Sequence, residues 1–160
     1  MENLVAITFQ DSDPFYDDNT LEDTLAICSN PFKKVRILLV EDNPSIQYLY
    51  RAMLSALDCQ VDFASNATEA FCMADNVYDL VFLDIGLPDK SGIEVAIELR
   101  RREIHKATRL IAVTAFTKEL IQNECDAAGI ELILTKPVHK KDIEALVEQT
   151  KATLKPTAIA

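Results

Sequence analysis

Five polar side chains could form one reactive site, although they are spread over almost a hundred positions. Each stands directly after a run of apolar residues or one residue beyond it: Glu41, Asp42, Asp84, Thr114 and Lys136. Three carboxylates, a hydroxyl and an ammonium thus recur at the same kind of place in the chain. This recurrence predicts a site that is assembled from distant parts of the sequence.

The chemistry of such a group is specific. Carboxylates about 4 Å apart repel each other by roughly 4 kcal/mol per pair at an effective dielectric constant of about 20. Three of them need a cation, and an all-oxygen cluster suits Mg²⁺ or Mn²⁺. A metal ion and Lys136 together would neutralise an incoming phosphoryl group, which is the main requirement for transferring it onto a carboxylate. The alternative is an acidic surface cluster with a lysine that forms a salt bridge.

The elements that must position these side chains alternate regularly along the chain. Short apolar runs predict five strands, and the first run is typical of a strand buried on both faces. The strand segments are VRILLV (35–40), QVDFA (60–64), LVFL (80–83), RLIAV (109–113) and ELIL (131–134).

Capping residues and helical periodicity predict a helix after each strand. Asn43 is a good N-cap with Pro44 at the first helical position. The apolar stripe of this helix is Ile46, Leu49, Tyr50, Met53, Leu54 and Leu57. Asn66 with Glu69 three residues later predicts a capping box for a helix to about Ala74. The remaining helices are expected over 92–102, from a Thr117 cap to Gly129, and along Ile143, Leu146, Val147 and Leu154.

This alternation predicts an α/β fold, a parallel sheet with helices on both faces. In open sheets of this kind, ligands bind outside the carboxyl ends of the strands. The five polar side chains would therefore meet at one edge of the sheet. The apolar run before Asp84 is explained in the same way, because the strand delivers the carboxylate to the site.

Composition and charge divide the 160 residues into parts. The apolar share of 49% and the charged share of 26% are typical of a globular protein. Residues 1–32 hold seven acids and no lysine or arginine. We therefore predict an acidic arm or linker over 1–34, one domain over 35–152 and a tail over 153–160.

Several function classes are disfavoured by the same totals. A net charge of −10 argues against binding to nucleic acid or to anionic membranes. No signal peptide and no long apolar span can be found, which favours a cytoplasmic protein without direct membrane contact. Only Gly86, Gly92 and Gly129 are present, so neither a GxGxxG fingerprint nor a Walker loop can form.

Cysteines and histidines give no metal or disulfide framework. The cysteines form no CxxC pair and are expected to be reduced and mostly buried: Cys28, Cys59, Cys72 and Cys125. With only two histidines, the sequence argues against a zinc enzyme. We expect His105 to be exposed in a polar loop, and His139 to be a solvated residue at the start of the last helix.

Four motifs and their spacing resemble the receiver domain of two-component response regulators, over about residues 35–151. They are LLVEDN (38–43), LDIGLPDKSG (83–92), VTA (113–115) and TKP (135–137). The resemblance implies a flavodoxin-like (βα)5 fold, a doubly wound parallel five-stranded sheet with strand order 2-1-3-4-5. It also implies phosphorelay signal transduction, in which a histidine kinase or a histidine phosphotransfer domain donates a phosphoryl group and thereby switches partner binding.

The resemblance assigns roles to the acidic residues. Asp84 would accept the phosphoryl group. Asp42, Asp84 and the backbone carbonyl of Gly86 would bind Mg²⁺, and Glu41 would assist. Such a domain is not an enzyme in the usual sense, since it catalyses only its own phosphorylation and dephosphorylation.

The same resemblance covers the last two strand ends. Thr114 would hold the phosphoryl oxygens in the active state, Ala115 would donate its backbone N–H, and Lys136 would pair with the acceptor. The bond between Lys136 and Pro137 would be cis. Ile133 departs from the family pattern, because many stand-alone receivers have a Tyr or Phe there that moves with the threonine.

Two aromatic residues flank the expected site. Phe116 occupies a position where receivers vary and where the dephosphorylation rate is tuned. Tyr48 faces away from the apolar stripe of the first helix, on the surface that receivers commonly offer to kinases or phosphotransfer domains.

Other functions stay open at this stage. A haloacid-dehalogenase-type phosphatase also phosphorylates an aspartate after a buried strand, but it needs a second aspartate where this chain has Gly86. A degenerate receiver that only binds partners would not need all five core residues. No room for a DNA-binding domain follows the last helix, so we expect a stand-alone regulator or a receiver from a hybrid histidine kinase. In the acidic arm, LVAITF (4–9) could form a strand and TLEDTLAICSN (20–30) a short helix.

Overall fold

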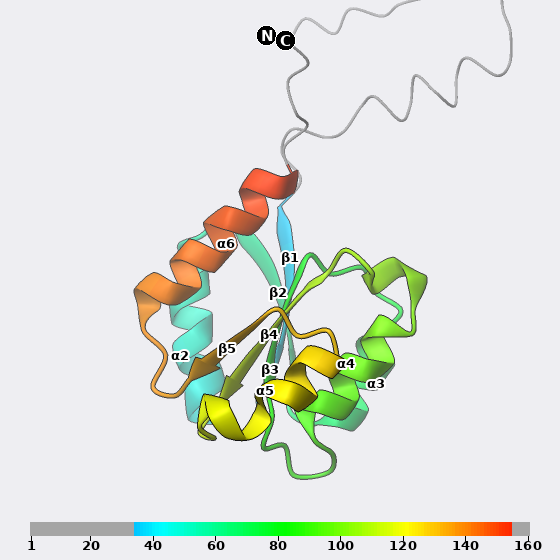
Figure 1. Ribbon diagram of the computed structural model, residues 1–160. Helices are drawn as coiled ribbons and strands as arrows, with labels where there is room; N and C mark the ends of the chain where they lie inside the picture. The colour runs from blue at the N-terminus through cyan, green and yellow to red at the C-terminus, as the bar shows by residue number, and fades with distance from the viewer. Residues whose placement is uncertain (1–33, 155–160) are drawn as a thin grey trace, which may run out of the picture. The chain divides into compact units, whose positions relative to one another are not determined.

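A computed structural model describes residues 34–154 of the chain. Its centre is a parallel sheet of five strands in the order β2-β1-β3-β4-β5 (Figure 1). The strands are β1 (Val35–Val40), β2 (Cys59–Ala64), β3 (Leu80–Asp84), β4 (Arg109–Thr114) and β5 (Leu132–Thr135). This order confirms the flavodoxin-like, doubly wound fold that the sequence predicts.

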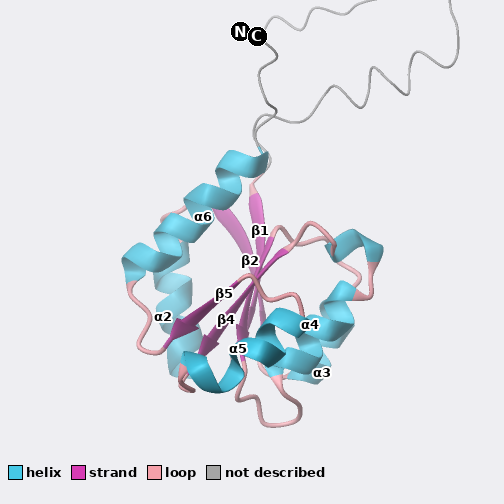
Figure 2. Ribbon diagram, in the orientation of Figure 1, coloured by secondary structure: helices cyan, strands magenta, loops and turns pink. Residues whose placement is uncertain are grey.

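A helix follows each strand, and the helices cover both faces of the sheet (Figure 2). They are α2 (Pro44–Leu54), α3 (Ala67–Met73), α4 (Gly92–Arg100), α5 (Lys118–Ala127) and α6 (Lys140–Leu154), and a short 3₁₀ turn, η1 (Glu103–His105), follows α4. α2 and α6 pack on one face, and α3, α4 and α5 on the other. The strand order reverses beside β1, which places the carboxyl ends of β1 and β3 at the expected ligand position.

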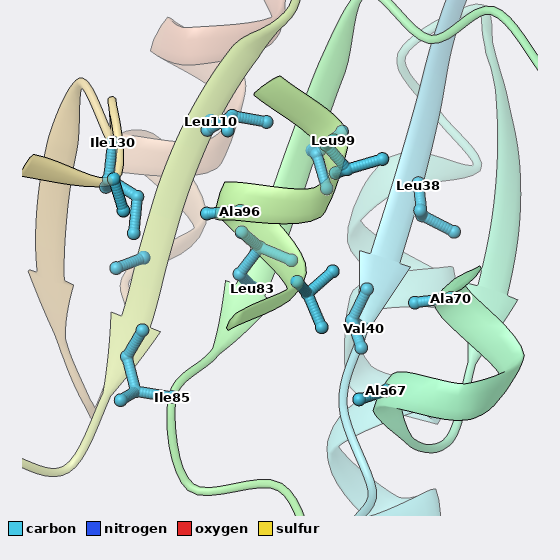
Figure 3. Close-up of a cluster of buried hydrophobic side chains, with 14 of the residues drawn as sticks. Leu38, Val40, Ala67, Ala70, Leu83, Ile85, Ala96, Leu99, Leu110 and Ile130 are labelled. Carbon is cyan, nitrogen blue, oxygen red and sulfur yellow. The ribbon is translucent and has the colours of Figure 1, made fainter. Parts of the chain in front are cut away.

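The two faces of the sheet bury two apolar clusters, as expected for parallel strands covered on both sides. Leu38, Leu83 and Leu110 are fully buried in the cluster beneath α3, α4 and α5 (Figure 3). Leu39 and Phe82 belong to the cluster beneath α2 and α6. Neighbouring residues of a strand thus enter opposite clusters, and this alternation fixes the face on which the residues at the strand ends lie.

The three predicted N-cap residues are confirmed, and two of them cap their helix with a side-chain hydrogen bond. The Asn43 side chain accepts hydrogen bonds from backbone N–H groups of the first turn of α2. Asn66 accepts from the N–H of Glu69 at 2.8 Å, and Glu69 accepts in return from the N–H of Ser65 at 2.7 Å. Thr117 is the N-cap of α5 by its backbone, but its side chain makes no capping hydrogen bond.

Two expectations about burial are wrong. Leu49 was placed on the buried stripe of the first helix, but it is 50% exposed because Tyr50 and Leu54 define the buried face of α2. Among the three cysteines that the structure describes, Cys125 is buried, Cys59 is intermediate and Cys72 is exposed. Only one of these three is therefore buried, so the expectation of mostly buried cysteines does not hold.

His105 is also misplaced by the sequence prediction, since it is fully buried instead of exposed. Its Nε2 lies 2.8 Å from the carbonyl oxygen of Ala74, and its Nδ1 lies 3.2 Å from Oγ1 of Thr108. Thr108 donates in turn to the carbonyl oxygen of Tyr78 at 2.7 Å. The charged neighbours of His105 pointed to a surface loop, but both ring nitrogens find partners inside the domain, which makes the burial tolerable.

The strand expected over residues 4–9, the helix expected over 20–30 and Cys28 all lie outside the described residues. Within residues 34–154, no helix is both long and apolar enough to cross a membrane. The described chain ends in α6, whose last residue is Leu154.

Candidate functional site

The carboxyl ends of the strands bring one lysine and two carboxylates into direct contact. Glu41 follows β1, Asp84 ends β3, and Lys136 lies one residue beyond the end of β5. The Lys136 ammonium donates hydrogen bonds to Oε2 of Glu41 and to Oδ2 of Asp84, both at 2.7 Å. The Glu41 and Asp84 side chains are only 3% and 9% exposed, so this ion pairing takes place largely out of water.

Burial and ion pairing act against each other at these groups. Burial raises the pKa of Glu41, and the Lys136 ammonium offsets only part of that effect. Burial alone would lower the pKa of Lys136, but its hydrogen bonds with Asp84 and Glu41 outweigh it and raise the pKa. Lys136 therefore stays charged and is the cation that makes the two buried carboxylates tolerable.

Backbone N–H groups complete the hydrogen bonding of the two buried carboxylates. Oδ1 of Asp84 accepts from the N–H of Gly86 at 2.9 Å. Oε1 of Glu41 accepts from the N–H of Asn43 at 3.2 Å. All four carboxylate oxygens of Glu41 and Asp84 thus have a donor, and two of these four donors come from the single Lys136 ammonium.

Asp42 adds a third carboxylate at the open side of the site. One oxygen each from Glu41, Asp42 and Asp84 lies within 4.8 Å of the other two, and Asp42 is exposed. Three negative charges face one lysine, which leaves an excess that a divalent cation would balance. Because Mg²⁺ prefers oxygen ligands and is held by one or two carboxylates, this donor set fits it.

Thr114 lies at the same edge of the sheet, and its hydroxyl is engaged by the backbone that follows β4. The residue is fully buried, and its Oγ1 accepts from the N–H of Phe116 at 3.1 Å. Its carbonyl oxygen accepts from the N–H of Lys136 at 2.8 Å, which joins the ends of β4 and β5. Ala115 directly follows Thr114, the last residue of β4, and is exposed.

The loop after β5 has the expected peptide geometry, since the bond between Lys136 and Pro137 is cis. Ile133 is buried at 7% exposure and belongs to the apolar cluster on the α3–α5 face. The position at which many receivers carry a mobile aromatic residue is therefore occupied here by a packed aliphatic side chain. His139, just before α6, is exposed, as the sequence predicts.

The two flanking aromatic residues are both exposed. Phe116 is 49% exposed beside the site, and Tyr48 is 74% exposed on α2. Tyr48 lies on the outer face of that helix, as the sequence predicts.

Sequence reasoning missed Asp89, which ties the loop after Asp84 to α3. Its carboxylate accepts from the N–H of Ala67 and the N–H of Thr68, both at 2.9 Å, and from Oγ1 of Thr68 at 2.8 Å. These hydrogen bonds lower the pKa of Asp89 strongly. Asp89 lies in the PDKSG segment of the receiver motif, but its partners Thr68 and Ala67 lie 21 and 22 residues earlier in the chain. The sequence therefore does not reveal these contacts.

Gly92 is a second residue whose local role was missed. A Cβ atom on Gly92 would lie 2.1 Å from the carbonyl oxygen of Asp84. The N–H of Gly92 donates to the carbonyl oxygen of Ile85 at 3.2 Å. The start of α4 can therefore pack directly against the end of β3 only because this residue has no side chain.

Comparison with known proteins agrees with the fold. Residues 37–148 match the family model of the response regulator receiver domain. The chain is 31% identical over 118 residues to the autoinducer 2 sensor kinase/phosphatase LuxQ of Vibrio harveyi, covering 72% of this chain and 14% of that protein. It is 33% identical over 122 residues to the transcriptional regulatory protein SrrA of Staphylococcus aureus, covering 73% and 49%. The chain thus spans less than half the length of either relative.

Solved receiver domains have the same fold. The receiver domain of a sensor histidine kinase from Pseudomonas aeruginosa PAO1, solved with a magnesium ion in its active site cleft, is 29% identical, with a TM-score of 0.68 and coverage of 75% of this chain and 99% of that one. A receiver domain from Methylobacillus flagellatus is 28% identical, with a TM-score of 0.66 and coverage of 74% and 99%.

The chain belongs to the response regulator receiver domain family. It is a receiver domain of two-component phosphorelay signalling, a regulatory domain of the phospho-accepting kind. Domains of this family interact with histidine kinases or phosphotransfer proteins, and they generally bind Mg²⁺.

Proposed function

We propose that Asp84 accepts a phosphoryl group from a phosphohistidine donor in a Mg²⁺-dependent reaction that switches partner binding. The observation that carries the proposal is the Lys136 ammonium, which lies 2.7 Å from both Asp84 and the buried Glu41. The donor is a histidine kinase or a histidine phosphotransfer domain. Residues 35–152 are the receiver domain, residues 1–34 are an acidic arm or linker, and residues 153–160 are a tail.

The chemistry is an in-line displacement at phosphorus. An oxygen of the Asp84 carboxylate attacks, the bond from phosphorus to the donor's imidazole nitrogen breaks, and the electron pair stays on the imidazole. Lys136 neutralises charge on the phosphoryl oxygens and on the acceptor. Asp42, Asp84 and the backbone carbonyl of Gly86 would hold Mg²⁺ with help from Glu41, and the ion would supply further positive charge to the phosphoryl oxygens.

Thr114 and Ala115 act after the transfer. The Thr114 hydroxyl leaves its bond with the N–H of Phe116 and binds a phosphoryl oxygen, and the Ala115 N–H donates to the same group. The exposure of Ala115 and the placement of Thr114 at the end of β4 support these roles. The domain catalyses only its own phosphorylation and dephosphorylation.

Two contexts fit such a domain. One is a stand-alone regulator, and the other is the receiver of a hybrid sensor histidine kinase that relays the phosphoryl group. The buried Ile133 favours the receiver of a hybrid kinase, because receivers of hybrid kinases often lack the mobile aromatic residue at this position. The similarity to a receiver domain of a sensor histidine kinase points the same way. A phosphatase of the haloacid-dehalogenase type is not retained, since the chain belongs to the receiver family.

The proposal is tested by labelling the protein with acetyl phosphate and Mg²⁺, and by measuring the intact mass. The wild type is expected to gain one phosphoryl group, and Asp84→Asn none. Asp89→Asn serves as a matched control, since it changes a neighbouring aspartate and should still be labelled. Equal labelling of the wild type and Asp84→Asn would refute the assignment of the acceptor.

A further inference from the structure

The hydroxyl of Tyr50 stands out because it is buried without a partner. Tyr50 lies on α2, is 3% exposed, and packs its ring 5.9 Å from that of Phe82. Among the described residues, no group forms a hydrogen bond with its hydroxyl, and no other buried side-chain nitrogen or oxygen lacks a partner. Buried polar groups are rarely left unsatisfied in native proteins, so an unpaired hydroxyl calls for an explanation.

The alternation of the strands places Tyr50 on the same face as the acidic site. Phe82 and Asp84 are two residues apart on β3, and Leu39 and Glu41 are two apart along β1, so each pair points to one face. Leu39 and Phe82 lie in one apolar cluster with Tyr50. Side chains on a helix also lean toward its N-terminus, and α2 begins at the carboxyl end of β1, beside the site.

The electrostatic environment of the hydroxyl agrees with this placement. Burial raises the pKa of Tyr50 most, and the negative charges of Glu41 and Asp84 raise it further. The hydroxyl therefore keeps its proton and remains a hydrogen-bond donor close to two carboxylates.

In the present arrangement the carboxylates have no need of that donor, since Lys136 and backbone N–H groups serve all four oxygens of Glu41 and Asp84. A phosphoryl group on Asp84 changes this. Its oxygens attract the Lys136 ammonium, and Oε2 of Glu41 then loses the protein group that donates to it. Glu41 is 2% exposed, so water cannot readily replace the lysine.

We propose that Tyr50 is a positioning residue that donates a hydrogen bond to the Glu41 carboxylate when Lys136 moves to the phosphoryl group. The tyrosine thereby stabilises the phosphorylated state and leaves the unphosphorylated state unaffected. This inference rests on the proposed function, because it requires a phosphoryl group on Asp84.

The test compares Tyr50→Phe with the wild type, since this substitution removes only the hydroxyl. Beryllium fluoride with Mg²⁺ serves as a stable stand-in for the phosphoryl group, and its affinity is measured by calorimetry. We expect about tenfold weaker binding in Tyr50→Phe, as for loss of a hydrogen bond to a charged group. The free energy of unfolding without beryllium fluoride should be unchanged or higher.

Tyr78→Phe is the matched control. Tyr78 is equally buried, and its hydroxyl donates to Asp62 at 2.9 Å, on the strand next to β1. This control is expected to lose stability and to keep the affinity of the wild type for beryllium fluoride. If Tyr50 has a purely structural role, Tyr50→Phe will also lose stability and keep the affinity of the wild type for beryllium fluoride. That result would overturn the inference.

A second readout follows the hydroxyl itself. With ¹³C at the ζ carbon of tyrosine, the NMR signal that disappears in Tyr50→Phe belongs to Tyr50. This signal should shift when beryllium fluoride binds to the wild type, and a signal that stays in place would overturn the inference. If the wild type binds beryllium fluoride and Tyr50→Phe binds it equally well, the inference alone is wrong. If the wild type binds none, the proposed function fails and the inference fails with it.

Discussion

The Lys136 ammonium and the Asp84 carboxylate lie 2.7 Å apart, although 52 residues separate them in the sequence. The same ammonium is the partner of Glu41, whose side chain is only 3% exposed. Stability and phosphoryl chemistry thus depend on one charge, because the group that makes the buried carboxylates tolerable is also the group that would bind a phosphoryl oxygen.

Lys136→Met should destabilise the domain by about 3 kcal/mol at pH 7.5, because it leaves two buried carboxylates without their cation. In the wild type, burial already raises the pKa of Glu41, and loss of the lysine raises it further. An acid whose pKa is raised by folding destabilises the fold above that pKa and is relieved as the pH falls. The loss of stability should therefore shrink between pH 7.5 and pH 5, as measured by urea unfolding.

The control for this measurement is Lys106→Met. The Lys106 side chain is 66% exposed and pairs with the exposed Glu103, so its removal should have little effect at either pH. A loss of stability in Lys136→Met that is the same at both pH values would contradict the role assigned to Glu41.

Asp42 should be needed for metal binding. We expect Asp42→Ala to weaken the binding of Mg²⁺ by about tenfold or more, because one of three carboxylates whose oxygens lie within 4.8 Å of one another is lost. Mn²⁺ can replace Mg²⁺ in a titration followed by electron paramagnetic resonance. Glu124→Ala, which removes an exposed acid from α5, is the matched control. Identical titrations of Asp42→Ala and the wild type would rule out this donor set.

Asp89 should couple the loop after Asp84 to α3 in a pH-dependent way. Hydrogen bonds from Ala67, Thr68 and Lys90 lower the pKa of Asp89 in the folded state. Its contribution to stability is therefore complete above the ordinary aspartate pKa of about 3.9 and is lost as the pH falls below that value. Asp89→Asn should be less stable than the wild type at pH 6, and the difference should begin to narrow below about pH 3.9, as the pH falls toward the strongly lowered pKa of the folded state. Thermal unfolding across this range would show a constant difference if Asp89 plays no such part.

The sequence predicts the sheet well because its signals are local. Each strand lies within one residue of its predicted bounds at either end, and the residues beyond the strand ends converge because parallel strands share one edge. This topology brings Glu41, Asp84 and Lys136 to one edge of the sheet, where the structure shows them in contact.

The missed features depend on partners that are distant in the sequence. His105 was expected at the surface because its neighbours are charged, but its partner Ala74 lies 31 residues earlier. Tyr50 belongs to the apolar stripe predicted for the first helix, but no neighbouring residue in the sequence indicates that its hydroxyl lacks a hydrogen-bond partner. Whether a buried polar group has a hydrogen-bond partner can be seen only in the three-dimensional structure.

The lifetime of the aspartyl phosphate should be long, because neither flanking position can hold the attacking water. Hydrolysis needs a water in line with the phosphorus, and the residues two positions after Asp84 and Thr114 flank that approach in receivers. Here they are Gly86, which has no side chain, and the apolar Phe116, whose ring is 49% exposed. We therefore expect slow loss of the phosphoryl group.

Two substitutions should accelerate this loss, by about tenfold each, which corresponds to about 1.4 kcal/mol of activation free energy. Phe116→Asn exchanges the ring for an amide. Gly86→Asn adds an amide where a Cβ would lie 3.7 Å from Oδ1 of Asp84, which is an ordinary contact. Leu120→Asn, at a position 71% exposed on α5, controls for added surface polarity and should leave the rate unchanged. The decay of the phosphorylated mass after removal of acetyl phosphate gives the rates, and variants that decay no faster than the wild type would show that water positioning does not set the lifetime.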